Sequence, residues 1–247
     1  MSVQNRANVS NLAFVLFGNI FTKFAVIFKQ ISGRSTDLVK YTLMGIQRVV
    51  SAITPVADEG NTGDGTCTLA TVVGLDTLGN KILPTIGTWT FELTAALVGK
   101  LTDPSGIDIV TGIALNDGST TVVKYAGLQF TITDGSTAFV SGDKFTLPVV
   151  ADGDYVPYDP ENVLGAAVPA GIYVGDDIAA ADIAAGDVTD VAVYVGGNCT
   201  IDSDQLVLEN GALTDIVPGT NQSVEDVLAN LGIFIENTVA GSGFENS

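Results

Sequence analysis

The sequence predicts an all-β protein with one short helix near its C-terminal end. Short runs of Val, Ile, Thr and aromatic residues recur at roughly ten-residue spacing, with Gly, Asp, Asn and Pro between them. This is the pattern of strands joined by tight turns. The chain has 28 glycines and no long amphipathic pattern of helical period, which disfavours a helical bundle. Its 247 residues suffice for one large β domain or two small ones.

Residues 1–58 are predicted to form an N-terminal arm and the first part of a core. The most apolar run of the chain, residues 11–28, contains Asn19, Thr22 and Lys23, and no small-residue cleavage site follows it. We therefore expect a buried segment here rather than a signal peptide or a membrane helix. Residues 24–57 alternate loosely and predict two or three strands, although a short helix over 38–50 is also compatible with the spacing.

Residues 59–150 are predicted to form a small Ig-like β-sandwich module. The stretch DEGNTGDG at 58–65 is typical of a linker. We expect Trp89 inside the sandwich rather than on its surface. Five runs rich in β-forming residues follow the linker, at 67–75, 88–97, 106–115, 120–133 and 144–151.

Residues 151–247 are predicted to complete the core. Strands are expected over 164–174, 191–201 and 205–213, with an acidic, alanine-rich loop between the first two. Ser223 and Asp226 have the spacing of a capping box at the start of a helix, and Gly232 is placed to end it. A last short strand is expected at 233–235.

The charge distribution is uneven. The net charge is −18, yet six of the ten basic residues fall within the first fifty residues, where Asp37 is the only acid. An acidic body disfavours binding to nucleic acid, whose phosphates require cations. The basic N-terminal stretch is suited to an acidic surface of a partner protein.

The sequence predicts no enzyme. The chain has no histidine, and it has no P-loop, GxGxxG or GxSxG motif, so we expect no catalytic residues and no cofactor. Its acidic pairs do not follow the calcium-binding EF-hand loop, and two cysteines form no zinc motif, so no metal site is predicted. A disulfide between Cys67 and Cys199 is left open.

Two stretches carry a resemblance to phage head proteins. Residues 122–150 resemble the end of a β-sandwich module found in such proteins, with the pattern FTIxDGxTxFxxGDxF around Asp134, Phe139 and Asp143. Residues 155–197 resemble the signature of the lambda-type head decoration family: an entry of the YxPxDP kind, a strand containing AGIY, an acidic loop and a valine strand ending in Gly. Residues 222–236 are similar to that family's C-terminal helix and last strand.

The resemblance implies a homotrimer with a β-tulip-like core that binds the major capsid protein on the outer surface of the virion head. A decoration or cement protein of this kind would stabilise the capsid, with the sandwich as an outward-facing insertion and no contact with nucleic acid or membrane. Alternatives are another virion component, such as a head fibre or tail tube protein, and a carbohydrate-binding surface module.

Two sets of contact residues follow as hypotheses. The apolar and basic side chains of the arm are expected to contact the capsid, unless the arm folds back into its own subunit. Apolar strand faces of the core are expected to form the trimer contact. The capsid set is Arg6, Phe14, Leu16, Phe21, Lys23, Phe24, Ile27 and Lys29, and the trimer set is Ile172, Val193 and Ile233.

Overall fold

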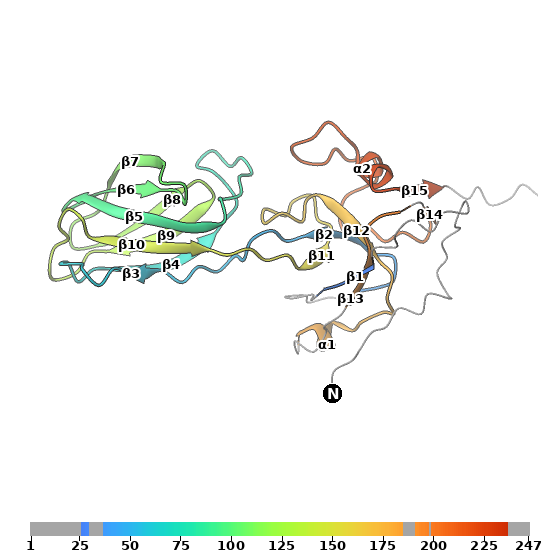
Figure 1. Ribbon diagram of the computed structural model, residues 1–247, viewed down its shortest axis with the longest axis horizontal. Helices are drawn as coiled ribbons and strands as arrows, with labels where there is room; N and C mark the ends of the chain where they lie inside the picture. Colours follow the sequence, from blue (N-terminus) through green and yellow to red (C-terminus); the bar gives the residue numbers. More distant parts are fainter. Residues whose placement is uncertain (1–25, 30–36, 185–190, 198, 237–247) are drawn as a thin grey trace, which may run out of the picture. The chain divides into compact units, whose positions relative to one another are not determined.

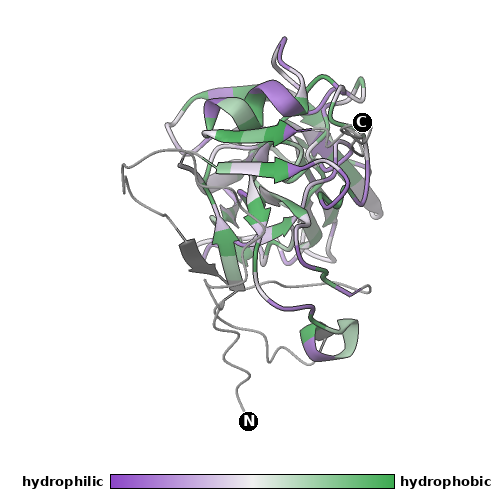
Figure 2. Ribbon diagram, turned by 90° about the vertical axis from the view of Figure 1, so that its right-hand side faces the viewer, coloured by the Kyte–Doolittle hydropathy of each residue, from purple (hydrophilic) through white to green (hydrophobic). Residues whose placement is uncertain are grey.

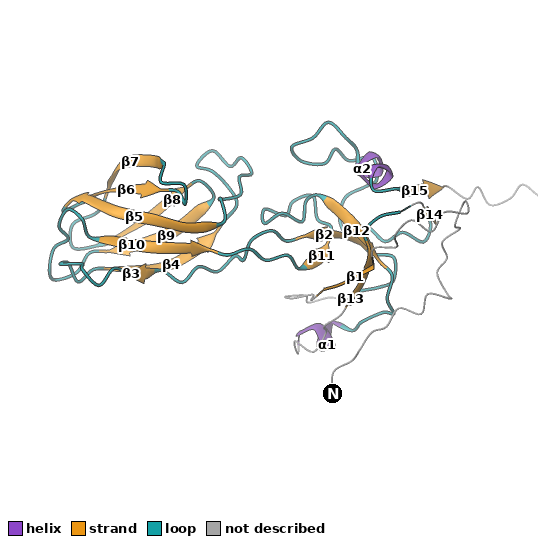
Figure 3. Ribbon diagram, in the orientation of Figure 1, coloured by secondary structure: helices purple, strands orange, loops and turns teal. Residues whose placement is uncertain are grey.

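The computed structural model describes residues 26–29, 37–184, 191–197 and 199–236, and every structural statement below concerns these residues. Strands dominate, and two short helices accompany them (Figure 3). The predicted all-β class is confirmed. The acidic segment predicted as a loop contains a one-turn helix, α1 (Ala180–Ala184). Alanine has the highest helix propensity, and the Asp37 carboxylate accepts a hydrogen bond from the Ala180 N–H at the start of this helix.

The chain divides into two compact units (Figure 1). Unit 1 comprises residues 1–47 and 154–247, and unit 2 comprises residues 48–153. Unit 2 begins before the predicted boundary at residue 58, because strand β3 (Val56–Ala57) pairs with strand β10 (Lys144–Val149) inside this unit. It also ends slightly later than predicted, since Ala151 forms a bridge with Val49.

Unit 2 is a β-sandwich of two antiparallel sheets. Its core contains Phe91 and Phe130, one from each sheet, with their rings edge-to-face at a centroid distance of 5.4 Å. Trp89 is only 2% exposed and donates its indole N–H to the Thr85 carbonyl, which confirms its predicted interior position. One sheet has the order β3-β10-β5-β6-β7, with β5 at Gly87–Ala95, β6 at Val98–Thr102 and β7 at Asp108–Ala114; the other has the order β4-β9-β8, with β4 at Thr66–Val72, β9 at Leu128–Thr133 and β8 at Thr120–Tyr125.

Unit 1 contains a five-stranded antiparallel sheet whose strands come from the segments that precede and follow unit 2 in the sequence. Strand β2 precedes the insertion and lies between β11 and β12, which follow it. Residues 43–46 thus form a strand, not the alternative helix. The strand order is β1-β13-β12-β2-β11, with β1 at Val26–Lys29, β2 at Leu43–Ile46, β11 at Tyr155–Pro157, β12 at Pro169–Tyr173 and β13 at Val191–Tyr194.

The sheet of unit 1 is buried on both faces. Along β12, Ile172 belongs to one apolar cluster and the next residue, Tyr173, belongs to a second. Successive side chains of a strand point to opposite faces, so the two clusters lie on opposite sides of the sheet. The first cluster also includes residues of helix α2 (Val224–Asn230) and of the short parallel pair formed by β14 (Cys199–Asp202) and β15 (Ile233–Glu236).

Helix α2 begins as its sequence predicts. The Ser223 hydroxyl accepts from the Asp226 N–H, and the Asp226 carboxylate accepts from the Ser223 N–H, which completes the capping box. Gly232 follows the helix with a φ of 77°, a conformation that favours glycine. Figure 2 shows both hydrophilic and hydrophobic residues on this helix, in keeping with its buried Val224 and Leu228. The strand predicted over 205–213 is absent from the described structure, where Val207 forms an isolated bridge.

Candidate functional surfaces

The predicted capsid-contact residues fall largely outside the described structure. Six of the eight precede residue 26, and the other two, Ile27 and Lys29, lie in β1. Strand β1 pairs antiparallel with β13 of its own unit, with Ile27 opposite Val193. The end of the predicted arm therefore adds a strand to its own subunit, which is the fold-back alternative for residues 26–29. The six that precede residue 26 are Arg6, Phe14, Leu16, Phe21, Lys23 and Phe24.

The predicted trimer-contact residues are buried inside unit 1. Ile172, Val193 and Ile233 each have an exposed fraction of 0%. Ile172 and Ile233 pack in one apolar cluster and Val193 packs in the other. The hypothesis that these three side chains form the trimer contact is wrong, because each of them is already buried against its own subunit and offers no surface to another one. The large apolar side chains exposed in the described part of unit 1 are Ile216 and Phe234, at 59% and 47%.

The segment 58–65, predicted as a linker, is held firmly against the sandwich. Asp143 is 2% exposed, and its carboxylate accepts hydrogen bonds from three backbone N–H groups, those of Thr62 at 2.7 Å, Gly63 at 2.9 Å and Val140 at 3.0 Å. Burial acts to raise the pKa of Asp143, but these three hydrogen bonds together outweigh it and lower the pKa below its usual value. Asp143 is thus a buried anion that holds two loops together.

A second carboxylate and a phenyl ring add to these contacts between the segment 58–65 and the loop before β10, which we call the clasp. Asp64 accepts hydrogen bonds from the Ser136 hydroxyl and the Thr137 N–H, and both lower its pKa. The ring of Phe139 covers Gly65 so closely that a Cβ atom at this glycine would lie 2.2 Å from the ring. Asp143 and Phe139 therefore have structural roles in the sandwich.

A shallow groove lies on the outward face of β10, β5, β6 and β7 in unit 2. Its first feature is a row of alternating charges that crosses these strands, which we call the charged row. Glu92 on β5 is the register partner of both Lys144 on β10 and Lys100 on β6. Carboxylates end the row at both sides: Asp58 lies 3.3 Å from the Lys144 ammonium, and Asp108 lies 3.4 Å from that of Lys100.

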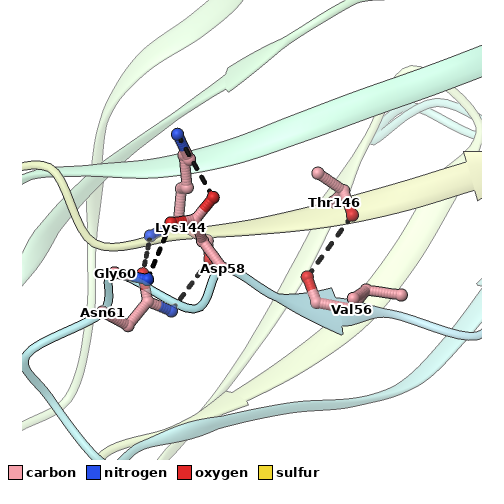
Figure 4. Close-up of polar contacts among 6 residues, drawn as sticks. All are labelled: Val56, Asp58, Gly60, Asn61, Lys144 and Thr146. Atoms are coloured by element: carbon pink, nitrogen blue, oxygen red, sulfur yellow. Dashed lines mark hydrogen bonds and ion pairs between the residues drawn. The ribbon is translucent and has the colours of Figure 1, made fainter.

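The backbone around Lys144 is fixed by a side chain from the clasped segment (Figure 4). The amide group of Asn61 donates to the Lys144 carbonyl at 2.9 Å and accepts from the Lys144 N–H at 2.7 Å. The Lys144 carbonyl also accepts from the Asp58 N–H at 3.1 Å, so both backbone groups of Lys144 are satisfied by the segment that follows β3. The Asp58 carboxylate in turn accepts from the Gly60 N–H at 3.0 Å, which orients it toward Lys144.

The second feature of the groove is a row of hydroxyl groups, which we call the threonine row. Thr90 on β5 is the register partner of Thr146 on β10 and of Thr102 on β6. All three are partly exposed and alternate along their strands with fully buried residues. Thr102 donates to the Asp108 carboxylate at 2.7 Å. The threonine row runs beside the charged row, two residues away along each strand.

Three ionisable groups of the groove, Lys100, Asp108 and Asp58, have pKa values shifted toward their charged forms. Hydrogen bonds to Glu92 and Asp108 raise the pKa of Lys100. The Thr102 hydroxyl, with help from Lys100, lowers the pKa of Asp108, and the Gly60 N–H and Lys144 lower that of Asp58. A protonated lysine amine is a poor nucleophile, so Lys100 is suited to hydrogen bonding rather than to covalent chemistry.

The two cysteines are free thiols and lie in different units, so the disulfide left open by the sequence is not formed. Burial raises the pKa of Cys67 to about 12 and that of Cys199 to about 11, which keeps both thiols protonated and unreactive near neutral pH. No cluster of three metal-ligating side chains was found among the residues that the structure describes. Within the same residues, neither helix is long and apolar enough to cross a membrane.

The groove was not predicted from the sequence. The alternation of buried and exposed residues along each strand was a usable signal, because it places Thr90 and Glu92, or Lys144 and Thr146, on one outward face. The pairing of strands far apart in sequence, which brings these residues into two rows, had no such signal.

No family model and no curated protein matches this chain. Among solved structures, it is similar to FlgL of Xanthomonas campestris, with 20% identity over 47% of this chain and 34% of that chain, at a TM-score of 0.32. The flagellar junction protein FlgL from Legionella pneumophila is also similar, with 14% identity over 46% of this chain and 37% of that chain, at a TM-score of 0.30. The chain thus corresponds to about a third of the length of these proteins. Likeness at these TM-scores carries no information on function.

Proposed function

We propose that this chain is a virion structural protein, a decoration or cement protein that binds the outer surface of a tailed-phage head and stabilises it. One observation carries the proposal. The two sequence resemblances fall into different units: residues 155–197 and 222–236, similar to the decoration family, belong to unit 1, whereas residues 122–150, similar to the phage sandwich module, belong to unit 2. Two resemblances of separate kinds thus coincide with two separately packed bodies.

The way in which unit 2 is inserted supports an outward-facing role for it. The Gln47 N–H donates to the Asp154 carbonyl at 2.9 Å, so the two ends of unit 1 that flank the insertion are paired neighbours. A module joined at one such point leaves the sheet of unit 1 intact. Unit 1 is therefore suited to bind the particle while unit 2 is exposed to the medium.

The proposed partners are the major capsid protein and two further copies of this chain. The contact between copies requires exposed side chains of unit 1, and Ile216 and Phe234 replace the buried residues as candidates. Contact with the acidic or apolar surface of a capsid is assigned to residues 1–25, whose basic and apolar composition contrasts with the acidic remainder. The proposed role is structural and requires no cofactor.

The proposal is tested with purified protein and expanded empty heads of the phage that encodes it. The full chain should sediment with the heads, be a trimer in solution by light scattering, and bind less well as salt is raised. A variant without residues 1–25, which keeps β1, should remain a folded trimer but lose binding. Failure of the full chain to bind heads, or binding to isolated tails instead, would contradict the proposed role.

A further inference from the structure

We propose that the groove on unit 2 is a binding site for a neutral, linear polysaccharide, with the sugar chain crossing β10, β5 and β6. This inference is independent of the proposed function, because it rests on the outward face of the sandwich alone. The groove is a hollow on the described surface whose lining consists of charged side chains, threonines and glycines. Such a lining offers no apolar pocket for a peptide side chain or a lipid, so the ligand must be bound through polar contacts.

The charged row indicates a neutral ligand. Its two ammonium groups, Lys100 and Lys144, alternate with three carboxylates, so neither sign of charge is left in large excess. A nucleic acid or another polyanion would bring its charges close to Glu92 and its neighbours. A polycation would have to displace the two lysines from their carboxylates. A neutral ligand avoids both costs.

The chemistry of the two rows matches hydroxyl groups. A sugar hydroxyl both donates and accepts hydrogen bonds, and vicinal hydroxyls can donate together to one carboxylate. The charged row supplies acceptors at Glu92 and donors at Lys100. The Thr102 and Thr146 hydroxyls donate to the Asp108 carboxylate and the Val56 carbonyl, so they offer a ligand acceptor oxygens. Hydrogen bonds to charged groups are the stronger kind, so a site without an aromatic stacking surface can still select a saccharide.

The geometry of the sheet indicates a linear chain. Equivalent residues on adjacent strands recur about every 4.8 Å, which is close to the length of one sugar unit in an extended chain. Thr146, Thr90 and Thr102 are in register on three successive strands, and the charged row repeats the same spacing. A chain that lies across the strands therefore meets a threonine at each sugar, with Lys144, Glu92 and Lys100 beside the successive threonines.

The side chains are positioned before any ligand arrives. Lys100 is held by Glu92 and Asp108 with nitrogen–oxygen distances of 3.4 Å each, and Asn61 fixes the backbone that carries Lys144. Ordering these groups therefore adds little to the entropic cost of binding. The site is shallow, so we expect weak binding, with dissociation constants of about 1 mM.

The test is affinity electrophoresis of the full chain in gels that contain dextran, galactomannan, xyloglucan or hydroxyethylcellulose, with heparin and pectate as anionic comparisons. We expect retardation by at least one neutral polymer. Thr90→Val and Thr146→Val remove a hydroxyl but keep a β-branched side chain, and Glu92→Gln removes a charge at nearly constant size. Each should weaken retardation, by about tenfold in dissociation constant for Glu92→Gln.

The matched control is Thr131→Val on β9, a partly exposed threonine of the other sheet, which should bind like the unchanged protein. Circular dichroism melts verify that each variant is folded, and the two threonine variants provide independent evidence if one of the three is not. The inference is overturned if no neutral polymer retards the protein, if only heparin or pectate does, or if the groove variants and Thr131→Val behave alike.

Discussion

The backbone N–H of Gly63 donates to the carboxylate of Asp143 at 2.9 Å, and this bond joins the segment before β4 to the loop before β10. Sequence reasoning treats a glycine- and acid-rich stretch such as 58–65 as a loose linker. Here the same composition forms a clasp, because glycine lets the backbone approach Phe139 closely and a buried carboxylate needs several backbone donors.

Removal of the buried carboxylate should destabilise unit 2. Asp143→Ala leaves the N–H groups of Thr62, Gly63 and Val140 without their acceptor, and we expect a loss of about 3 kcal/mol in the free energy of unfolding. Asp117→Asn, an exposed acid on the same unit, should change the free energy by less than about 0.5 kcal/mol. Urea unfolding of both variants measures the free energy of unfolding. Equal stability of the two variants would show that the clasp does not stabilise unit 2.

Stability should also fall in acid. The pKa values of Asp143, Asp64 and Asp226 are lowered in the folded chain, so the unfolded chain takes up protons first as the pH falls. The contribution of these groups is therefore complete above about pH 4, the ordinary pKa of aspartate, and is lost as the pH falls through the lower, folded values. Thermal melts across this range should show the decline, with a shallower acid dependence for unit 2 in Asp143→Ala. If the melting temperature of unit 2 depends on pH equally in this variant and in the unchanged protein, groups other than Asp143 cause the acid sensitivity.

The two units should unfold independently of each other. Gly45 lies in β2 between β11 and β12, and a Cβ atom there would be 2.4 Å from the Ala166 carbonyl oxygen, a backbone atom that cannot move aside. Gly45→Ala should cost unit 1 about 2 kcal/mol or more. Calorimetry should show two unfolding transitions. Gly45→Ala should lower the temperature of the unit 1 transition alone, and Asp143→Ala should lower that of the unit 2 transition alone. A single transition shifted by both variants would contradict independent units.

Deletion of unit 2 should leave unit 1 folded. Gln47 and Asp154 are paired neighbours at the end of the β2–β11 ladder, so Asn-Gly in place of residues 48–153 should close them into a two-residue hairpin. We expect the shortened protein to keep its strand content by circular dichroism and the oligomeric state of the full chain by light scattering. Aggregation of the shortened protein, while residues 48–153 expressed alone are folded, would show that unit 1 depends on the module.

Much of the fold could be predicted from the sequence because local patterns specify it. The runs at 88–97 and 120–133 predicted strands, with Trp89 inside the sandwich, and the pair Ser223 and Asp226 predicted the start of α2. Strand β6 at 98–102 was missed because a five-residue strand with a central Gly99 and Lys100 lacks a strong pattern; that glycine is required, since a Cβ there would meet the ring of Phe91 at 2.3 Å.

The surfaces were harder to predict because they depend on which strands pair. Ile172, Val193 and Ile233 were selected as apolar strand residues, but a pattern of alternation does not reveal which apolar side chains are already buried within their own subunit. For the same reason, Glu92 and Lys144 lie far apart in the sequence yet are register partners in the groove. Pairing between strands that are far apart in the sequence therefore determines both which apolar residues are buried and which polar residues form the groove.

Electron cryo-microscopy of expanded heads, with and without the purified chain, tests the proposed role most directly. The account predicts added density at the threefold positions of the outer shell, with unit 1 against the capsid and the sandwich of unit 2 above it. Heads that lack this density after incubation with the full chain, or density confined to the tail or to fibres, would contradict a decoration protein.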